Sequence, residues 1–174
     1  IAPFRGEQKD GYVSSLFHAC YRREVFDKVG RFNERMVRTE DNEMNYRIRK
    51  AGFKFYCSCS IKSMQLIRSS FAGMMRQKFL NGFWIGKTLK ECPRCLSIYH
   101  VVPALFVVGL LSAFFCKIGL LAIASYALLD IVMTVVAIIF ADKKRNITNI
   151  LLPVIFLVMH ISYGVGTIIG LIKN

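Results

Sequence analysis

Hydrophobic and polar residues are distributed differently in the two parts of this chain, which meet near residue 97. Three long apolar runs follow that point, at residues 98–116, 118–141 and 147–172. An α-helix needs roughly 20 apolar residues to cross the hydrocarbon core of a bilayer, and each run is near or above that length. The pattern therefore predicts three transmembrane helices. The first run is short and contains Pro103, so a re-entrant or interfacial segment is its alternative.

The first part of the chain alternates between short apolar and polar stretches, which predict strands as well as helices. Residues 11–20 and 54–57 have the pattern of strands. One short helix is expected to end at Gly30, and a second helix is expected to follow residue 39 and to end at Gly52. Together these elements predict an α/β fold for the region before the apolar runs.

A longer helix is predicted over about residues 70–90, directly before the first apolar run. Phe71, Met75 and Phe79 repeat at helical spacing, and polar and basic residues lie around them. A helix of this kind can lie along the headgroup surface of a membrane. Residues 1–97 are therefore expected to form a soluble region that includes an interfacial helix, and residues 98–174 a membrane region.

Charged residues at the ends of the apolar runs predict an orientation. Lys87, Lys90 and Arg94 precede the first run, and residues 143–145 are all basic, whereas the turn between the first two runs carries only Lys117. Basic loops stay on the cytoplasmic side of a membrane. The sequence thus predicts a multi-pass protein of the cell membrane, with the soluble region in the cytoplasm and the C-terminus outside.

The chain is strongly basic, with 24 Lys and Arg residues against 11 Asp and Glu residues and a formal net charge of +13. In the soluble region the basic residues are interleaved with acids, and neither a zinc-finger spacing nor a base-stacking aromatic motif accompanies them. We therefore expect no nucleic-acid partner. Lipid headgroups and nucleotide phosphates are the anions that this charge suits.

Four of the six cysteines form two close pairs, Cys57 with Cys59 and Cys92 with Cys95. Four thiolates can hold zinc, but the first pair has a single intervening residue, and no histidine spacing supports such a site. A cytoplasmic location also disfavours disulfides. The sequence therefore predicts reduced structural thiols and no metal site within this chain.

Three carboxylates, Glu40, Asp41 and Glu43, open the second predicted helix of the soluble region. Negative charge at a helix N-terminus is favourable by itself, at roughly 0.3 to 1 kcal/mol for each residue. The same position can also hold a catalytic base. Other motifs are needed to choose between these interpretations.

Those motifs resemble family 2 glycosyltransferases, and most closely the membrane enzymes of succinoglycan-type exopolysaccharide synthesis. The resemblance is carried by residues 19–26 (ACYRREVF), 29–34 (VGRFNE), 39–41 (TED), 52–54 (GFK), 76–77 (RQ), 81–84 (NGFW) and 163–166 (YGVG). It implies that residues 1–97 are the C-terminal part of a GT-A glycosyltransferase domain. It also implies membrane-bound, inverting transfer of a sugar from a nucleotide-sugar donor to a saccharide acceptor, expected to be lipid-linked, in polysaccharide biosynthesis.

The resemblance assigns catalytic roles to two residues. Asp41 is implied to be the general base that takes the proton of the acceptor hydroxyl, and Glu40 to orient the loop or the acceptor. The departing nucleoside diphosphate needs a divalent cation, Mg²⁺ or Mn²⁺, which the family binds through an Asp-x-Asp motif. No Asp-x-Asp occurs in this sequence. The donor-binding half is therefore expected upstream of Ile1, and the isolated chain is expected to be inactive.

Further residues are expected at the substrate. In processive relatives, a Gln-x-x-Arg-Trp motif binds the acceptor and the diphosphate; Gln77 fits it, but the spacing does not, which favours the addition of single sugars. The residues assigned to substrate binding are His18, Arg22, Arg23, Arg76, Gln77 and Trp84. Ordinary packing for His18, a solvated helix start for the first two arginines and a membrane anchor for Trp84 are the alternatives.

A second class of function rests on polar residues inside the apolar runs. Asp130 lies within the second run, where a charge costs roughly 2.5 to 3.5 kcal/mol, and His160 in the third is a plausible partner. The alternative function is thus a non-catalytic transporter or scaffold subunit with a basic, lipid-binding cytoplasmic domain.

Overall fold

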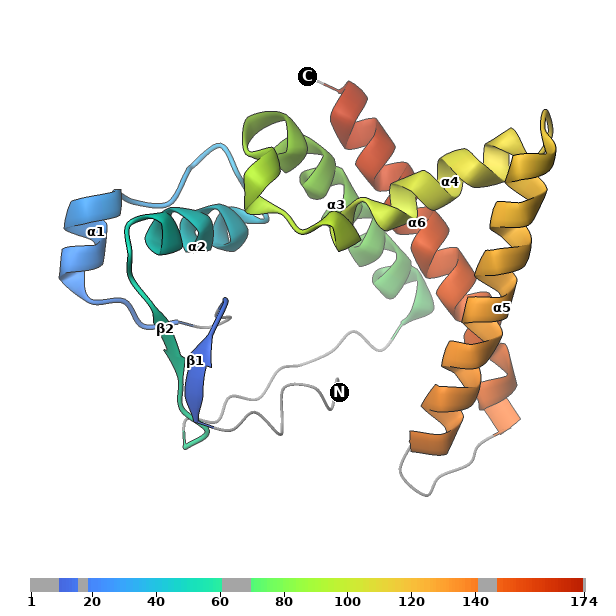
Figure 1. Cartoon of the computed structure of the whole chain (residues 1–174), viewed down its shortest axis with the longest axis horizontal. Coiled ribbons are helices and arrows are strands. Elements are labelled where there is room, and N and C mark those ends of the chain that lie inside the picture. The colour runs from blue at the N-terminus through green and yellow to red at the C-terminus, as the bar shows by residue number, and fades with distance from the viewer. Residues whose placement is uncertain (1–9, 16–18, 61–69, 141–146, 174) are drawn as a thin grey trace.

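The computed structural model describes residues 10–15, 19–60, 70–140 and 147–173, and its elements form two groups (Figure 1). The first group contains strands β1 (Gly11–Val13) and β2 (Phe55–Cys57) and helices α1 (Arg23–Val29) and α2 (Glu40–Lys50). The second contains helices α3 (Phe71–Glu91), α4 (Val102–Ser112), α5 (Lys117–Phe140) and α6 (Leu152–Ile172), with 3-10 turns η2 (Pro93–Cys95), η3 (Ile98–His100) and η4 (Ile147–Leu151).

The predicted α/β fold of a GT-A domain is wrong. The described residues are mostly helical, and their strands are β1 and β2, which pair antiparallel with Tyr12 opposite Tyr56. An α/β domain needs parallel strands joined by crossover helices, and this two-stranded ribbon has none. The predicted strand positions agree with β1 and β2, but each strand is only three residues long.

A small core holds the first group together. Val25 of α1, Met44 and Ile48 of α2, and Phe55 of β2 are buried against one another. Met44 and Ile48 are four residues apart, so they lie on one face of α2 and point into this core. Their helical spacing therefore fixes which face of α2 is turned away from solvent.

Arg47 of α2 ties this helix to the segment after α1. Its guanidinium donates to both carboxylate oxygens of Glu43, at 2.6 and 2.8 Å, and to the backbone carbonyls of Val29 and Arg31, the latter at 2.8 Å. Bidentate pairs between arginine and a carboxylate are strong and directional. Glu43 therefore has a structural role that differs from those of Glu40 and Asp41.

Helices α3 and α6 make the most extensive helix contact among the described elements, and glycines allow it. A Cβ at Gly82 or Gly86 would collide with backbone carbonyls of α6, and a Cβ at Gly166 or Gly170 would collide with those of α3. Small residues of this kind let two helix backbones approach closely. The glycines of the Tyr-Gly-x-Gly segment are thus part of a packing surface.

Within the described part of the chain, two helices are long and apolar enough to cross a membrane, over Gly119–Ile139 and Asn149–Ile172. Helix α4 has 11 residues, about 16 Å of helix, which is roughly half of the hydrocarbon thickness. The predicted span over 98–116 and its alternative, a segment that does not cross, both stay predictions, and the length of α4 favours the second. Membrane association through α5 and α6 is the part of the predicted localisation that the structure supports.

The end of α3 lies beside the C-terminal end of α6. The Nζ atom of Lys90 donates to the carbonyl oxygen of Lys173 at 3.1 Å. The predicted topology placed the soluble region and the C-terminus on opposite sides of the membrane, and this contact does not agree with that placement.

Cys92 and Cys95 form a disulfide, with their Cα atoms 5.4 Å apart. The prediction that these two thiols are reduced is therefore wrong. Cys92 ends α3 and Cys95 ends the next 3-10 turn, so the turn itself brings the two side chains together. The four other cysteines of the chain are not joined in disulfides.

Replacing Gly86 with Ala should destabilise the protein, because the new methyl group collides with the backbone of α6. Overpacking of this kind costs about 1 to 3 kcal/mol. The measurement is the thermal unfolding midpoint in detergent micelles. Gly109→Ala is the matched control, since its Cβ would lie 3.4 Å from the Cβ of Ala122. Equal midpoints for the two variants would contradict the close packing of α3 on α6.

Replacing Arg47 with Met should lower the free energy of unfolding by about 2 kcal/mol, because three backbone and side-chain partners lose a charged donor. The check is a denaturant titration that follows the fluorescence of Trp84. Glu24→Gln serves as control, since its pair with Arg22 is exposed and 3.5 Å long, and should change stability by less than about 0.5 kcal/mol. A neutral Arg47→Met variant would refute the structural role.

The disulfide predicts a count of reactive thiols. Unfolded but unreduced protein should take up an alkylating reagent at the four cysteines outside the disulfide, and protein that has been reduced first should take it up at all six. Mass spectrometry of the intact chain reads both numbers. Six modified cysteines without reduction would show that the pair is not joined.

Candidate functional site

The turn before α2 carries the unusual backbone of this region. Thr39 has a φ of 67° and a ψ of 6°, the left-handed conformation. A β-branched residue rarely adopts this conformation, and a strained residue of this kind costs about 1 to 3 kcal/mol. Backbone strain persists where surrounding contacts enforce it, and it often marks functional sites. The strained residue immediately precedes Glu40 and Asp41.

Helix α3 supplies the contacts that hold this turn. The hydroxyl of Thr39 lies 2.5 Å from the hydroxyl of Thr88, which is fully buried, and the guanidinium of Arg38 donates to the side-chain oxygen of Asn81 at 2.6 Å. Asn81 and Thr88 are seven residues apart, so they lie on one face of α3. The turn is therefore fixed from two points, two helical turns apart.

The two carboxylates of the first turn of α2 have different surroundings. Asp41 is partly buried, and its Oδ1 accepts the backbone N–H of Asn42 at 2.8 Å. One carboxylate oxygen of Glu40, Oε2, is closed off from solvent and has no hydrogen-bond partner among the described residues. Buried polar atoms nearly always have a partner, so an unsatisfied carboxylate oxygen calls for an explanation by function or by an absent group.

Tyr21 connects Asp41 to a pocket. Burial raises the pKa of the Tyr21 hydroxyl above its usual value, and the negative charge of Asp41 raises this pKa further. A coulombic effect of this kind requires the two side chains to lie near each other. Tyr21 also lines an open pocket of about 680 Å³ between α1 and the segment that follows it. The proposed base and the pocket therefore share a neighbour.

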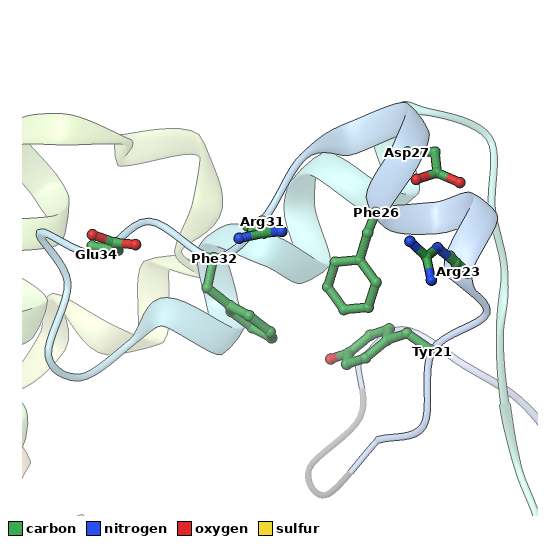
Figure 2. Close-up of a pocket in the computed structure, with 7 residues that line it drawn as sticks. All are labelled: Tyr21, Arg23, Phe26, Asp27, Arg31, Phe32 and Glu34. Atoms are coloured by element: carbon green, nitrogen blue, oxygen red, sulfur yellow. The ribbon is translucent and has the colours of Figure 1, made fainter.

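Three aromatic rings form one wall of this pocket (Figure 2). The ring of Tyr21 lies 5.6 Å from that of Phe26 and 6.1 Å from that of Phe32, both edge to face, and the two phenylalanine rings are 6.3 Å apart. Arg23, Asp27, Arg31 and Glu34 complete the lining. The pocket thus combines an aromatic wall with charges of both signs.

The predicted substrate residues of the first group fall in different places. Arg23 lines the pocket, whereas Arg22 is exposed and pairs weakly with Glu24. His18 lies outside the described residues. Of Arg22 and Arg23, the structure thus brings one to the pocket.

The predicted substrate residues of α3 are also divided. Gln77 and Trp84 are each four residues before a residue that holds the strained turn, Asn81 and Thr88, so they share that face of the helix. The backbone carbonyl of Trp84 accepts the hydroxyl of Thr88 at 2.8 Å. Arg76 is exposed and lies about a quarter of a turn away from this face.

The polar residues in the membrane helices make a contact that was not predicted. The Nδ1 atom of His160 lies 3.0 Å from the hydroxyl of Tyr126, and the ring of Tyr126 stacks on Phe106 at 4.0 Å. The predicted pairing of His160 with Asp130 is therefore replaced by a pairing with Tyr126, one helical turn away on α5. This cluster joins α4, α5 and α6.

Sequence reasoning missed the aromatic wall and the anchors on α3. Tyr21, Phe26 and Phe32 were treated as parts of family-like segments, because their separations of five and six residues match no single helix face. Asn81 lies in the segment that was compared with the Gln-x-x-Arg-Trp motif, and this comparison did not indicate its contact with Arg38. Their roles become visible once α1, α2 and α3 are placed together.

The described residues offer little to a metal ion. They contain no group of three or more His, Cys, Asp or Glu side chains that could hold one. Glu43, the third carboxylate of α2, is engaged by Arg47. Mg²⁺ and Mn²⁺ prefer several oxygen ligands, which this set does not supply, and we derive no chemical step through a metal.

Comparisons with protein-family models, with curated proteins and with solved structures found no match to this chain. The resemblance to family 2 glycosyltransferases therefore rests on the sequence motifs alone.

Proposed function

We propose that this chain carries the catalytic base and part of the acceptor site of a membrane-bound sugar transferase. The observation that carries the proposal is the strained Thr39, which α3 holds and which immediately precedes Glu40 and Asp41. The charge of Asp41 acts on Tyr21, a residue of the aromatic pocket. The proposal does not require a GT-A domain. It requires a positioned carboxylate, a pocket beside it and attachment to the membrane.

In the proposed reaction, a hydroxyl group of the acceptor attacks the anomeric carbon of the donor sugar. The hydroxyl proton passes to the carboxylate of Asp41 as the new carbon–oxygen bond forms. The bond from the anomeric carbon to the nucleoside diphosphate breaks, and the diphosphate leaves with the bonding electrons, so the configuration at carbon inverts. A positioned general base typically contributes 10² to 10⁴-fold to such a rate.

The local contacts suit Asp41 to this role better than its neighbours. Its Oδ1 is oriented by the backbone N–H of Asn42, which leaves the carboxylate in a defined direction at the helix start. Glu43 is neutralised by Arg47 and holds structure instead. Glu40, with one oxygen buried, suits a role in orienting the turn or the acceptor.

Attachment to the membrane supports a lipid-linked acceptor. Helix α5 is apolar, and almost none of its candidate span is covered by the rest of the described chain. Membrane lipids are the partner that covers such a surface. A nucleotide-sugar donor, a divalent cation and a cytoplasmic position of the soluble region stay predictions, and the residues for the donor and the cation are expected outside this chain.

Replacing Asp41 with Asn should reduce sugar transfer by about 10² to 10⁴-fold, because the amide cannot accept the hydroxyl proton. The whole protein, in membranes, is supplied with radiolabelled nucleotide sugars, and label is counted in the lipid extract and in released saccharide. Glu24→Gln, an exposed change at the start of α1, should keep full activity. Both variants should reach the membrane in equal amounts.

Wild-type activity in Asp41→Asn would exclude this residue as the base. Absence of transfer by the wild-type protein from all donors tested would contradict the transferase proposal as a whole. Equal amounts of the variants in the membrane separate loss of chemistry from loss of folding.

A further inference from the structure

The charges around the aromatic pocket are balanced. Arg23 and Arg31 provide two positive groups, and Asp27 and Glu34 provide two negative groups. A pocket for a phosphate or diphosphate needs an excess of positive charge and convergent donors. The mixed lining disfavours an anion, although the chain as a whole has a net charge of +13. This pocket is thus an exception to the basic character of the protein.

The polar groups of the lining can serve a neutral ligand that is rich in hydroxyl groups. Each hydroxyl is both a donor and an acceptor. Guanidinium groups can only donate, and ionised carboxylates can only accept, so a lining with both kinds satisfies both halves of a hydroxyl. A saccharide has such groups on most carbons of its ring.

The aromatic wall suits the remaining surface of a sugar ring. Phe32 is 39% exposed and lines the pocket together with Tyr21 and Phe26 (Figure 2). An aromatic ring presents a flat apolar face, and a pyranose presents C–H groups on the faces of its ring. The volume of about 680 Å³ is within the range of about 300 to 1,000 Å³ for small-molecule pockets.

We infer that this pocket binds a neutral pyranose unit of the acceptor, with Phe32 as the stacking residue. The inference rests on the proposed function for its connection to an acceptor, because Tyr21 joins the pocket to Asp41. It names the substrate class at this position as uncharged saccharide, and it assigns the diphosphate of the donor to another place. Arg23 then binds sugar hydroxyls.

The test measures binding directly and does not depend on transfer. The whole protein in detergent micelles is titrated with methyl pyranosides of glucose, galactose, mannose and N-acetylglucosamine, and saturation transfer from protein to sugar protons is followed by NMR. The methyl glycoside of glucuronic acid is the matched anionic ligand, and inorganic pyrophosphate is the anion probe. At least one neutral pyranoside should bind, and more tightly than the glucuronide.

Phe32→Ala should raise the dissociation constant of the neutral pyranoside about three- to tenfold, because the stacking surface is lost. Phe71→Ala removes an exposed phenylalanine from α3 outside the pocket and should leave binding unchanged. Both residues are substantially exposed, so neither change should prevent folding.

Three results would overturn the inference. The first is absence of binding by all four neutral pyranosides, and the second is equal binding by Phe32→Ala and wild type. The third is displacement of the bound sugar by pyrophosphate in the wild-type protein, with loss of this displacement in Arg31→Gln. Failure of the proposed function looks different, because pyranosides would then bind through Phe32 while the wild-type protein transfers no sugar. Transfer by a protein that binds no pyranoside would instead reject the pocket alone.

Discussion

The position of α3 is the constraint on which the rest of the structure depends. One face of this helix, with Gly82 and Gly86, is in backbone contact with α6, and a separate face, with Asn81 and Thr88, holds the turn before α2. Both faces follow from helical spacing, since residues four or seven positions apart share a face of a helix. The helix therefore connects the membrane region to the candidate site without an intervening flexible segment.

The left-handed conformation of Thr39 costs free energy, which the hydrogen bonds between its turn and α3 must offset. A left-handed threonine costs about 1 to 3 kcal/mol, and the hydrogen bonds of Thr39 and Arg38 to α3 contribute a similar amount, at about 0.5 to 1.5 kcal/mol for a neutral bond and more for a charged one. The strained turn is stable only while α3 stays in place. The packing of glycines on α6 thus supports the orientation of Asp41, although no glycine is near that residue in the sequence.

Local patterns predicted the parts of the fold that depend on neighbouring residues. The acidic start of α2 and its end before Gly52 were both visible in the sequence. The extent of α3 was also close to the predicted range of 70–90. These features follow from helical periodicity and from charge at helix ends, which need no knowledge of distant contacts.

The failures concern features that depend on distant parts of the chain. The sequences of β1 and β2 suggested parts of a larger sheet, because the pattern of one strand does not show how many neighbouring strands pair with it. The apolar run at 98–116 was long enough to suggest a span, yet α4 ends at Ser112 and the chain turns before α5. The aromatic pocket is lined by residues of α1 and of the segments on either side of it. No helical or strand periodicity in the sequence connects these residues.

Helix α6 is apolar, and both other helices and membrane lipid can cover its surface. The charges on α3 indicate where α6 packs on protein. From Gly164 onwards, its buried residues contact α3 and α4, and the contact with α3 extends to Lys90 beside Lys173. Helix α3 also carries Arg76 and Lys78, and each charge would cost roughly 2.5 to 3.5 kcal/mol in hydrocarbon. The contact between the two helices is therefore best accommodated at the membrane boundary. Helix α5 is the element that lipid is expected to surround, because the rest of the described chain leaves it uncovered. The second half of α6 instead packs on α3, which holds the turn of the candidate site.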